Sequence, residues 1–324
     1  YPTPTTIDTF YSNADGYLVT PEKLPYGEGY SLVEVQAPYG YTLNTEPVYF
    51  DITEDNSTEE AGITVIVVER ANMAQKGVIN ISKTGEVFST VTESGSVYLP
   101  VYEVKGLAGA VYEVTALEDV YTLDGTLRAS AGEVVDTVET GADGIAVTKE
   151  LYLGKYAVRE ITAPNGMVLN GETHEVELGY AGQEISVTET ATSYYNERQK
   201  VEIALSKAME TDSIFGIGNN GEIADVTFGI YAVSDITALD GSVIPADGLL
   251  EIVDVGADGT AQFSVDLPFG AYYVREVATN AAYILSDEKY PVEFAYAGQD
   301  TAVVTISVNE GNPIDNDLIY GSVH

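Results

Sequence analysis

Apolar and polar residues alternate over short stretches of this chain. Runs rich in Val, Ile, Tyr and Thr are separated by turns rich in Gly, Asn and Asp, and no helical periodicity extends beyond a turn or two. In the stretch "LYLGKYAVREITAPNG" a two-residue period places Tyr156, Val158 and Glu160 on one face of a strand, which reads as a core face. The pattern predicts an all-β fold. It also predicts a buried carboxyl group at Glu160. This group must be paired, protonated or needed for a reaction, because burying an unpaired carboxylate costs free energy.

The same stretch recurs along the chain. It reads "LPYGEGYSLVEVQAP" near residue 30, "LYLGKYAVREITAP" near 156 and "LPFGAYYVREVATN" near 272, so that Glu34, Glu160 and Glu276 hold one equivalent position. The tetrapeptide "YAGQ" at 180–183 returns at 296–299, a shift of 116 residues that equals the shift from Glu160 to Glu276. The sequence therefore predicts tandem β domains of about 120 residues each.

A second pattern crosses the boundaries between repeats. "NMAQKGVINISK" at 72–83 and "NERQKVEIALSK" at 196–207 share Asn, Gln-Lys, Ile and Ser-Lys at identical offsets, and "NDLIYGSVH" begins the same pattern at Asn316. We interpret the Asn as ending one domain and the Lys as lying in the first strand of the next, across a very short linker. The expected domains are 1–73, which lacks its N-terminal strand, 74–198 and 199–320, with 321–324 as the start of a further repeat, in which Val323 takes the offset of Ile79. We expect the chain to be an excerpt of a longer array.

Composition excludes several classes of function. The 324 residues include 51 acidic and 14 basic ones, so the field of the protein repels nucleic acid and anionic lipid and favours a monomer. There is no cysteine, and no apolar run is long enough to insert into a membrane. His174 and His324 have no ligand-spaced neighbours, and no D-x-D-x-D-G loop occurs, so neither a metal nor another cofactor is expected. "GIGNNG" at 216–221 is followed by strand-like residues and is interpreted as a flexible turn.

The combined motifs resemble a known family. A Lys in a first strand, then L-x-x-G-x-Y-x-V-x-E with A-P-x-G, then an Asn in a last strand, is similar to the collagen-adhesin B-type (CnaB, or SpaA-like pilin) domains of Gram-positive surface proteins. The resemblance covers essentially the whole chain and implies tandem prealbumin-like, Ig-like β-sandwiches with autocatalytic Lys–Asn isopeptide bonds promoted by the Glu. It implies the following assignments: Lys83, Glu160 and Asn196 in the second domain, Lys207, Glu276 and Asn316 in the third, and Glu34 with the orphan acceptor Asn72 in the first. Asn309 and Asn312 are rival acceptors in the third domain, whose "VATN" departs from the A-P pattern of the other two.

These residue types suit the implied reaction. Burial lowers the pKa of a lysine toward the neutral, nucleophilic amine, and a buried neutral Glu can donate a hydrogen bond to the amide oxygen and relay protons to the leaving ammonia. The alternative is a purely structural role, in which Glu160 forms an ion pair with Lys83 and Asn196 is hydrogen-bonded beside it.

The expected function is a structural stalk segment of an extracellular, wall-attached adhesin or pilin-like protein. Such a segment is not an enzyme beyond a single self-cross-linking turnover, and its repeats interact only at their junctions. The alternative is an adhesin module that binds a glycan or host matrix protein. A glycosidase is disfavoured, because the repeated acid is expected to be buried away from any cleft.

Overall fold

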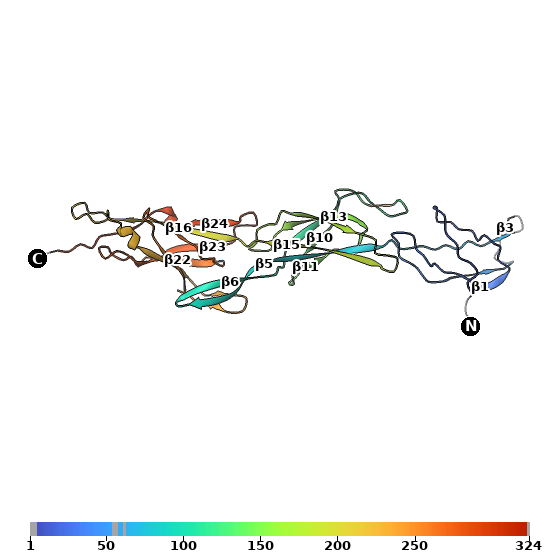
Figure 1. The fold of residues 1–324 in the computed structure, drawn as a ribbon, viewed down its shortest axis with the longest axis horizontal. Coiled ribbons are helices and arrows are strands. Elements are labelled where there is room, and N and C mark those ends of the chain that lie inside the picture. The colour runs from blue at the N-terminus through green and yellow to red at the C-terminus, as the bar shows by residue number, and fades with distance from the viewer. Residues whose placement is uncertain (1–4, 54–57, 61–62, 323–324) are drawn as a thin grey trace. The chain divides into compact units, whose positions relative to one another are not determined.

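The computed structural model describes residues 5–53, 58–60 and 63–322. The chain divides into two compact units (Figure 1): unit 1 comprises Tyr1–Gln75 and Tyr180–Ser186, and unit 2 comprises Lys76–Gly179 and Val187–His324. Val323 and His324, to which the sequence assigns the start of a further repeat and an isolated histidine, lie outside the described residues. The division into three domains stays a prediction.

Unit 1 has little regular structure and little core. Strands β1 (Gly27–Leu32) and β2 (Val48–Ile52) form one antiparallel pair, and β3 (Thr58–Glu60) and β4 (Ile63–Val65) form another. Among the described side chains of this unit, Ala37 is the single buried apolar one. The described part of this unit therefore has little apolar core.

The first part of unit 2 is built around the long strand β5 (Lys76–Ser94). Strand β15 (Val187–Asn196) lies parallel to it, while β6 (Val97–Gly106), β11 (Ile145–Val147) and β12 (Leu151–Tyr152) pair with it in antiparallel fashion. A second sheet has the order β10 (Val134–Glu139), β7 (Val111–Ala116), β13 (Gly154–Thr162) and β14 (Thr173–Leu178). The short pair β8 (Val120–Tyr121) and β9 (Leu127–Ala129) completes this part.

Alternating residues of the two sheets meet in one cluster, here called the Tyr112 core. Its members are buried because each strand turns every second side chain inward. They include Ile79, Ile81, Tyr112, Val114, Tyr156, Val158, Leu178 and Tyr194. Glu160 continues the inward row of Tyr156 and Val158 and is 2% exposed, which confirms the prediction of a buried carboxyl group.

The second part of unit 2 repeats this plan. Strand β16 (Lys200–Met209) pairs with β21 (Thr260–Phe263) in antiparallel fashion and with β24 (Val303–Ser307) and β25 (Ile314–Asn316) in parallel fashion. The opposing strands follow the order β20 (Leu249–Asp254), β17 (Thr227–Ala232), β22 (Gly270–Ala278) and β23 (Tyr290–Phe294). Between them lies the Phe228 core, which includes Ile203, Leu205, Phe228, Ile230, Tyr272, Val274, Phe294 and Ile314. The remaining elements are β18 (Ile236–Thr237), β19 (Val243–Ile244) and the 3-10 turns η1 (Glu222–Asp225) and η2 (Val308–Gly311).

The all-β prediction is confirmed, with one local difference. The "GIGNNG" turn is followed by η1, one turn of 3-10 helix, before strand β17 begins. In the described part of the chain no helix has the length and apolar character needed to cross a lipid bilayer.

The far ends of β5 and β6 form a hairpin that reaches beyond the Tyr112 core (Figure 1). We call residues 86–104 of this hairpin the arm. Phe88, Val91 and Tyr98 of the arm pack against the Phe228 core, and Val97 pairs with Leu249 of β20. The contact between the second and third repeats is thus more extensive than a short linker between independent repeats would give.

Candidate cross-linking sites

Strand register brings together the three residues assigned to the second repeat. Lys83 on β5 is paired with Tyr194 on the parallel strand β15, and Asn196 lies two residues further on, opposite Gly85. Two residues is one period of a strand, so Lys83 and Asn196 project from the same face of the sheet. Glu160 faces them from β13 of the opposing sheet.

Their polar atoms are in direct contact. Glu160 Oε1 lies 3.0 Å from Lys83 Nζ, and Asn196 Nδ2 donates to both carboxyl oxygens of Glu160 at 3.0 Å. Lys83 Nζ also donates to Asn196 Oδ1, closing a ring of three side chains. Gly85 permits this approach, because a Cβ at that position would lie 2.7 Å from the backbone oxygen of Asn196.

The ring of contacts is removed from water. Lys83, Glu160 and Asn196 are 0%, 2% and 1% exposed, and the Lys83 amine lies 5.8 Å from the centre of the Tyr194 ring. Desolvation lowers the pKa of Lys83 below its ordinary value, and the nearby Glu160 opposes that shift only in part. Burial therefore favours the neutral amine.

The orientation of the amide differs from the expected one. We expected Glu160 to donate to the oxygen of Asn196, whereas the carboxyl group faces Nδ2 and the oxygen faces Lys83. Glu160 consequently touches both nitrogen atoms of the candidate reaction, the attacking one and the leaving one.

The third-repeat residues share this register but not all of these contacts. Lys207 is paired with Ile314 on β25, and Asn316 follows two residues later. Asn316 Nδ2 donates to both oxygens of Glu276, at 2.9 and 3.0 Å. Lys207 Nζ instead donates to the backbone oxygens of Ala208, at 2.5 Å, and Ile314, at 2.8 Å.

Two further observations bear on this arrangement. Asn316 Oδ1 is buried and has no hydrogen-bond partner among the described residues. Desolvation lowers the pKa of Lys207, an effect that Glu276 opposes. The Lys207 amine and Asn316 Oδ1, an acceptor for it, are thus both buried on the same face. A rotation of the Lys207 side chain would bring them into contact.

The rival acceptors lie elsewhere. Asn309 Nδ2 donates to the backbone oxygens of Asn312 and Pro313, and Asn312 Nδ2 donates back to the oxygen of Asn309. Both side chains are thus engaged in the turn around η2, and Asn312 is exposed. Asn316 remains our choice of acceptor on this geometry.

Unit 1 contains the acid and the amide. Asn72 Nδ2 donates to Glu34 Oε2 at 2.7 Å and to the backbone oxygen of Thr42 at 3.0 Å. Among the described residues of unit 1 no lysine contacts this pair, and Lys23 is exposed. The orphan pair therefore keeps the acid–amide hydrogen bond of the other sites, but at half-buried positions and without a contacting lysine.

The sequence did not reveal one recurring contact of the acids. The backbone N–H ten residues after each Glu donates to its Oε2: Asn44 to Glu34 at 2.9 Å, Asn170 to Glu160 at 2.8 Å and Ser286 to Glu276 at 2.9 Å. The constant spacing of ten residues was the available signal. This bond fixes the rotation of the carboxyl group toward the Asn.

His174, the histidine that lies among the described residues, takes part in packing. His174 stacks on Tyr194 with ring centres 4.1 Å apart, and its Nδ1 lies 2.7 Å from Thr192 Oγ1. The described residues contain no group of three or more His, Asp or Glu side chains arranged to hold a metal ion.

This chain is similar to several known proteins. The streptococcal trypsin-resistant surface T6 protein (Streptococcus pyogenes serotype M6) is 30% identical over 73 residues, which is 22% of this chain and 14% of that protein. Similar solved structures include the Bacillus anthracis TIE protein (20% identity, TM-score 0.47, covering 76% of this chain and 35% of that one). Another is GBS52, the minor pilin of Streptococcus agalactiae (15% identity, TM-score 0.27, covering 76% and 98%).

This chain thus spans only a small part of the T6 protein and about a third of the TIE chain. The family model described as SpaA, a prealbumin-like fold domain, matches residues 3–65, 101–193 and 216–310. These three segments make up more than half of the chain, which therefore belongs to the SpaA prealbumin-like domain family.

Proposed function

We propose that this chain is a stalk segment of a cell-surface adhesin or pilin-like protein, stabilised by isopeptide bonds from Lys83 to Asn196 and from Lys207 to Asn316. The observation that carries the proposal is the closed ring of contacts among the buried side chains of Lys83, Glu160 and Asn196. In this proposal the segment comprises three domains, 1–73, 74–198 and 199–320, and lies outside the cell on a Gram-positive wall.

The proposed reaction is an amide exchange. The neutral amine of Lys83 attacks Cγ of Asn196, Glu160 takes a proton from Nζ and delivers it to Nδ2, the Cγ–Nδ2 bond breaks, and ammonia leaves. A new Cγ–Nζ amide bond remains, so that atoms and charges balance without any co-reactant. Contact among the groups replaces a bimolecular encounter, which raises the effective concentration of the amine by orders of magnitude.

The position of the bond suits a tether. Lys83 lies near the start of its domain and Asn196 at its end, so a covalent link between them carries tension past the intervening chain. By analogy with a disulfide, closing this loop also stabilises the domain by about 4 to 5 kcal/mol through the unfolded state.

The test is the intact mass of the folded protein. With both bonds formed, the protein weighs less than its sequence by two molecules of ammonia, and Glu160→Ala or Glu276→Ala each restores one of them. Glu34→Ala is the matched control, because unit 1 has the acid and amide without a contacting lysine, and it leaves both losses in place. A folded wild-type protein of unmodified mass would exclude the cross-links and favour the structural ion pair.

A further inference from the structure

Two repeated motifs have no role in the proposed cross-linking. One is the Gln of the Gln-Lys pair where a domain's first strand begins, and the other is the "YAGQ" loop. In unit 2 they are Gln199 and the loop Tyr296–Thr301. Gln199 is 1% exposed, its Nε2 donates to the oxygens of Gly298 (3.2 Å) and Thr301 (2.6 Å), and its Oε1 accepts from the Ala297 N–H at 2.8 Å. One buried amide side chain thus fixes the shape of the loop.

The shaped loop then contacts the second repeat at the turn 163–169. Gln299 Oε1 accepts from the N–H of Ala163 at 2.9 Å, and the backbone oxygen of Gln299 accepts from the N–H of Leu169 at 2.9 Å. Tyr296 donates its hydroxyl proton to the oxygen of Met167 at 3.0 Å. These bonds satisfy backbone groups of the turn that strands do not use.

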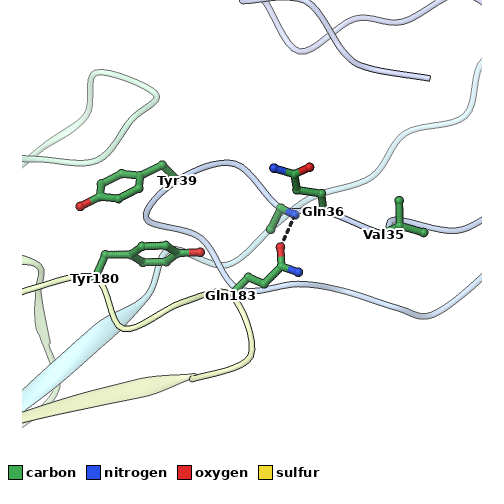
Figure 2. Close-up of a pocket in the computed structure, with 6 residues that line it drawn as sticks. Val35, Gln36, Tyr39, Tyr180 and Gln183 are labelled. Atoms are coloured by element: carbon green, nitrogen blue, oxygen red, sulfur yellow. Dashed lines mark hydrogen bonds between the residues drawn. The ribbon is translucent and has the colours of Figure 1, made fainter. Parts of the chain in front are cut away.

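Unit 1 contains the same set of bonds. Gln75 donates to the oxygens of Gly182 (2.8 Å) and Ile185 (2.5 Å) and accepts from the Ala181 N–H at 2.9 Å. Figure 2 shows the Gln183 side chain accepting a backbone N–H, which is that of Ala37 at 2.9 Å. In the same view Tyr180 lies beside Tyr39, with ring centres 4.6 Å apart. Because the same glutamine hydrogen bonds occur in both places, we interpret this contact as specific.

The third repeat has other residues at the two positions equivalent to Ala163 and Gln199. Thr279 stands where Ala163 stands in the second repeat, and Ile319, which donates its N–H to the oxygen of Ala282, stands where Gln199 donates to Gly166. Within the given residues, a buried Gln thus follows each of the two turns of the A-P-x-G type, and Ile319 follows the turn of another type.

We propose that the turn 163–169 is a docking surface whose partner is the "YAGQ" loop of the following repeat, and that this interface sets the orientation of the third repeat on the second. The inference does not depend on the isopeptide bonds. The partner is defined by chemistry: a glutamine amide that offers an acceptor to one backbone N–H, beside a tyrosine hydroxyl that donates to a backbone oxygen.

The orientation can be measured by electron–electron double resonance, because the chain has no cysteine of its own. Spin labels on Glu175→Cys and Glu293→Cys report from exposed positions in β14 and β23. The arm also joins the two repeats. The distance distributions are therefore compared in a Phe88→Ala background, which weakens the packing of the arm on the third repeat. We expect Gln299→Ala to broaden the distance distribution relative to that background. Gln262→Ala, which removes an exposed glutamine from β21, leaves it unchanged.

An equally narrow distribution in Gln299→Ala and in its Phe88→Ala parent would overturn the proposed interface. Intact mass, recorded on the same samples, reports the cross-links separately. Absence of the mass loss with a broadened distribution would refute the proposed function and leave the docking interface standing.

Discussion

Lys207 lies one strand period from the register partner of Asn316, the same diagonal that relates Lys83 to Asn196. The two pairs differ in the last contact: Lys83 Nζ donates to its Asn, whereas Lys207 Nζ donates to backbone oxygens. For the proposed reaction, this difference means that Lys83 already contacts its Asn, whereas the Lys207 side chain would first have to rotate.

The first prediction is an order of bond formation. The third centre must break two hydrogen bonds of Lys207 before its amine reaches Asn316, so we expect the second repeat to lose ammonia earlier than the third. Peptide mass mapping of protein quenched at intervals after cell-free synthesis measures both. Simultaneous loss of ammonia from both repeats, or earlier loss from the third repeat, would contradict the predicted order.

The second prediction concerns Gly85. A Cβ there would meet the oxygen of Asn196 and the side chain of Leu107, both at 2.7 Å, and would push β15 away from β5. We expect Gly85→Ala to reduce the cross-link of the second repeat strongly while the third keeps its own. Gly171→Ala is the control, since its Cβ would meet nothing within 4 Å. A full mass loss in Gly85→Ala would show that the close approach is dispensable.

The third prediction is a pH dependence in protein that cannot cross-link. In Asn196→Ala the folded pKa of Lys83 stays below the unfolded value, as desolvation requires, so the unfolded state binds more protons in the interval between them. The free energy of unfolding should therefore rise with pH across that interval, up to about pH 10. Urea denaturation of the second repeat measures it.

Asn196→Ala/Lys83→Met serves as the reference, because it retains every other titrating group. Burial raises the pKa of Tyr194 to about 12, and this tyrosine is present in both proteins, so its effect cancels in the comparison. Parallel pH profiles of the two variants would be inconsistent with a depressed lysine pKa.

The fourth prediction concerns the arm. Phe88 belongs to the second repeat in sequence but packs against the Phe228 core, so Phe88→Ala should destabilise the third repeat, by about 1 to 3 kcal/mol for a partly buried ring. Val104→Ala, an exposed apolar position of the arm at 59%, should change little. Amide hydrogen exchange, measured separately for each repeat, shows which repeat is destabilised. A loss of protection confined to the second repeat would argue against the packing of Phe88 on the Phe228 core.

Much of this architecture follows from the sequence, for identifiable reasons. The strand period and the repeated Glu positions predict the buried row ending in Glu160, because a two-residue alternation leaves only two faces to choose from. The arm was not predicted, since the alternation of residues 86–104 is the same whether the hairpin covers its own core or a neighbouring one. The backbone N–H bonds to Glu34, Glu160 and Glu276 were missed because a main-chain donor has no sequence signature beyond its spacing.

The site residues divide in the same way. Spacing alone could place Lys207 and Asn316 on adjacent strands, but the rotamer that sends the amine to Ala208 and Ile314 is decided by local packing. Likewise, the sequence marked Gln199 and Gln299 as recurrent without indicating that one shapes a loop and the other docks it.

The parallel pairing of β5 with β15 has a mechanical consequence. A chain pulled from its two ends loads β5 at Lys76 and β15 at Asn196, which are opposite ends of two neighbouring strands that run the same way. Their hydrogen bonds are then strained together in shear instead of opening one by one like a zipper. With a covalent bridge at Lys83, only the eight residues from Lys76 to Lys83 remain in the load path before it crosses to Asn196. Such a module would behave as a nearly inextensible link, and its length under tension would be set by its short connections to its neighbours.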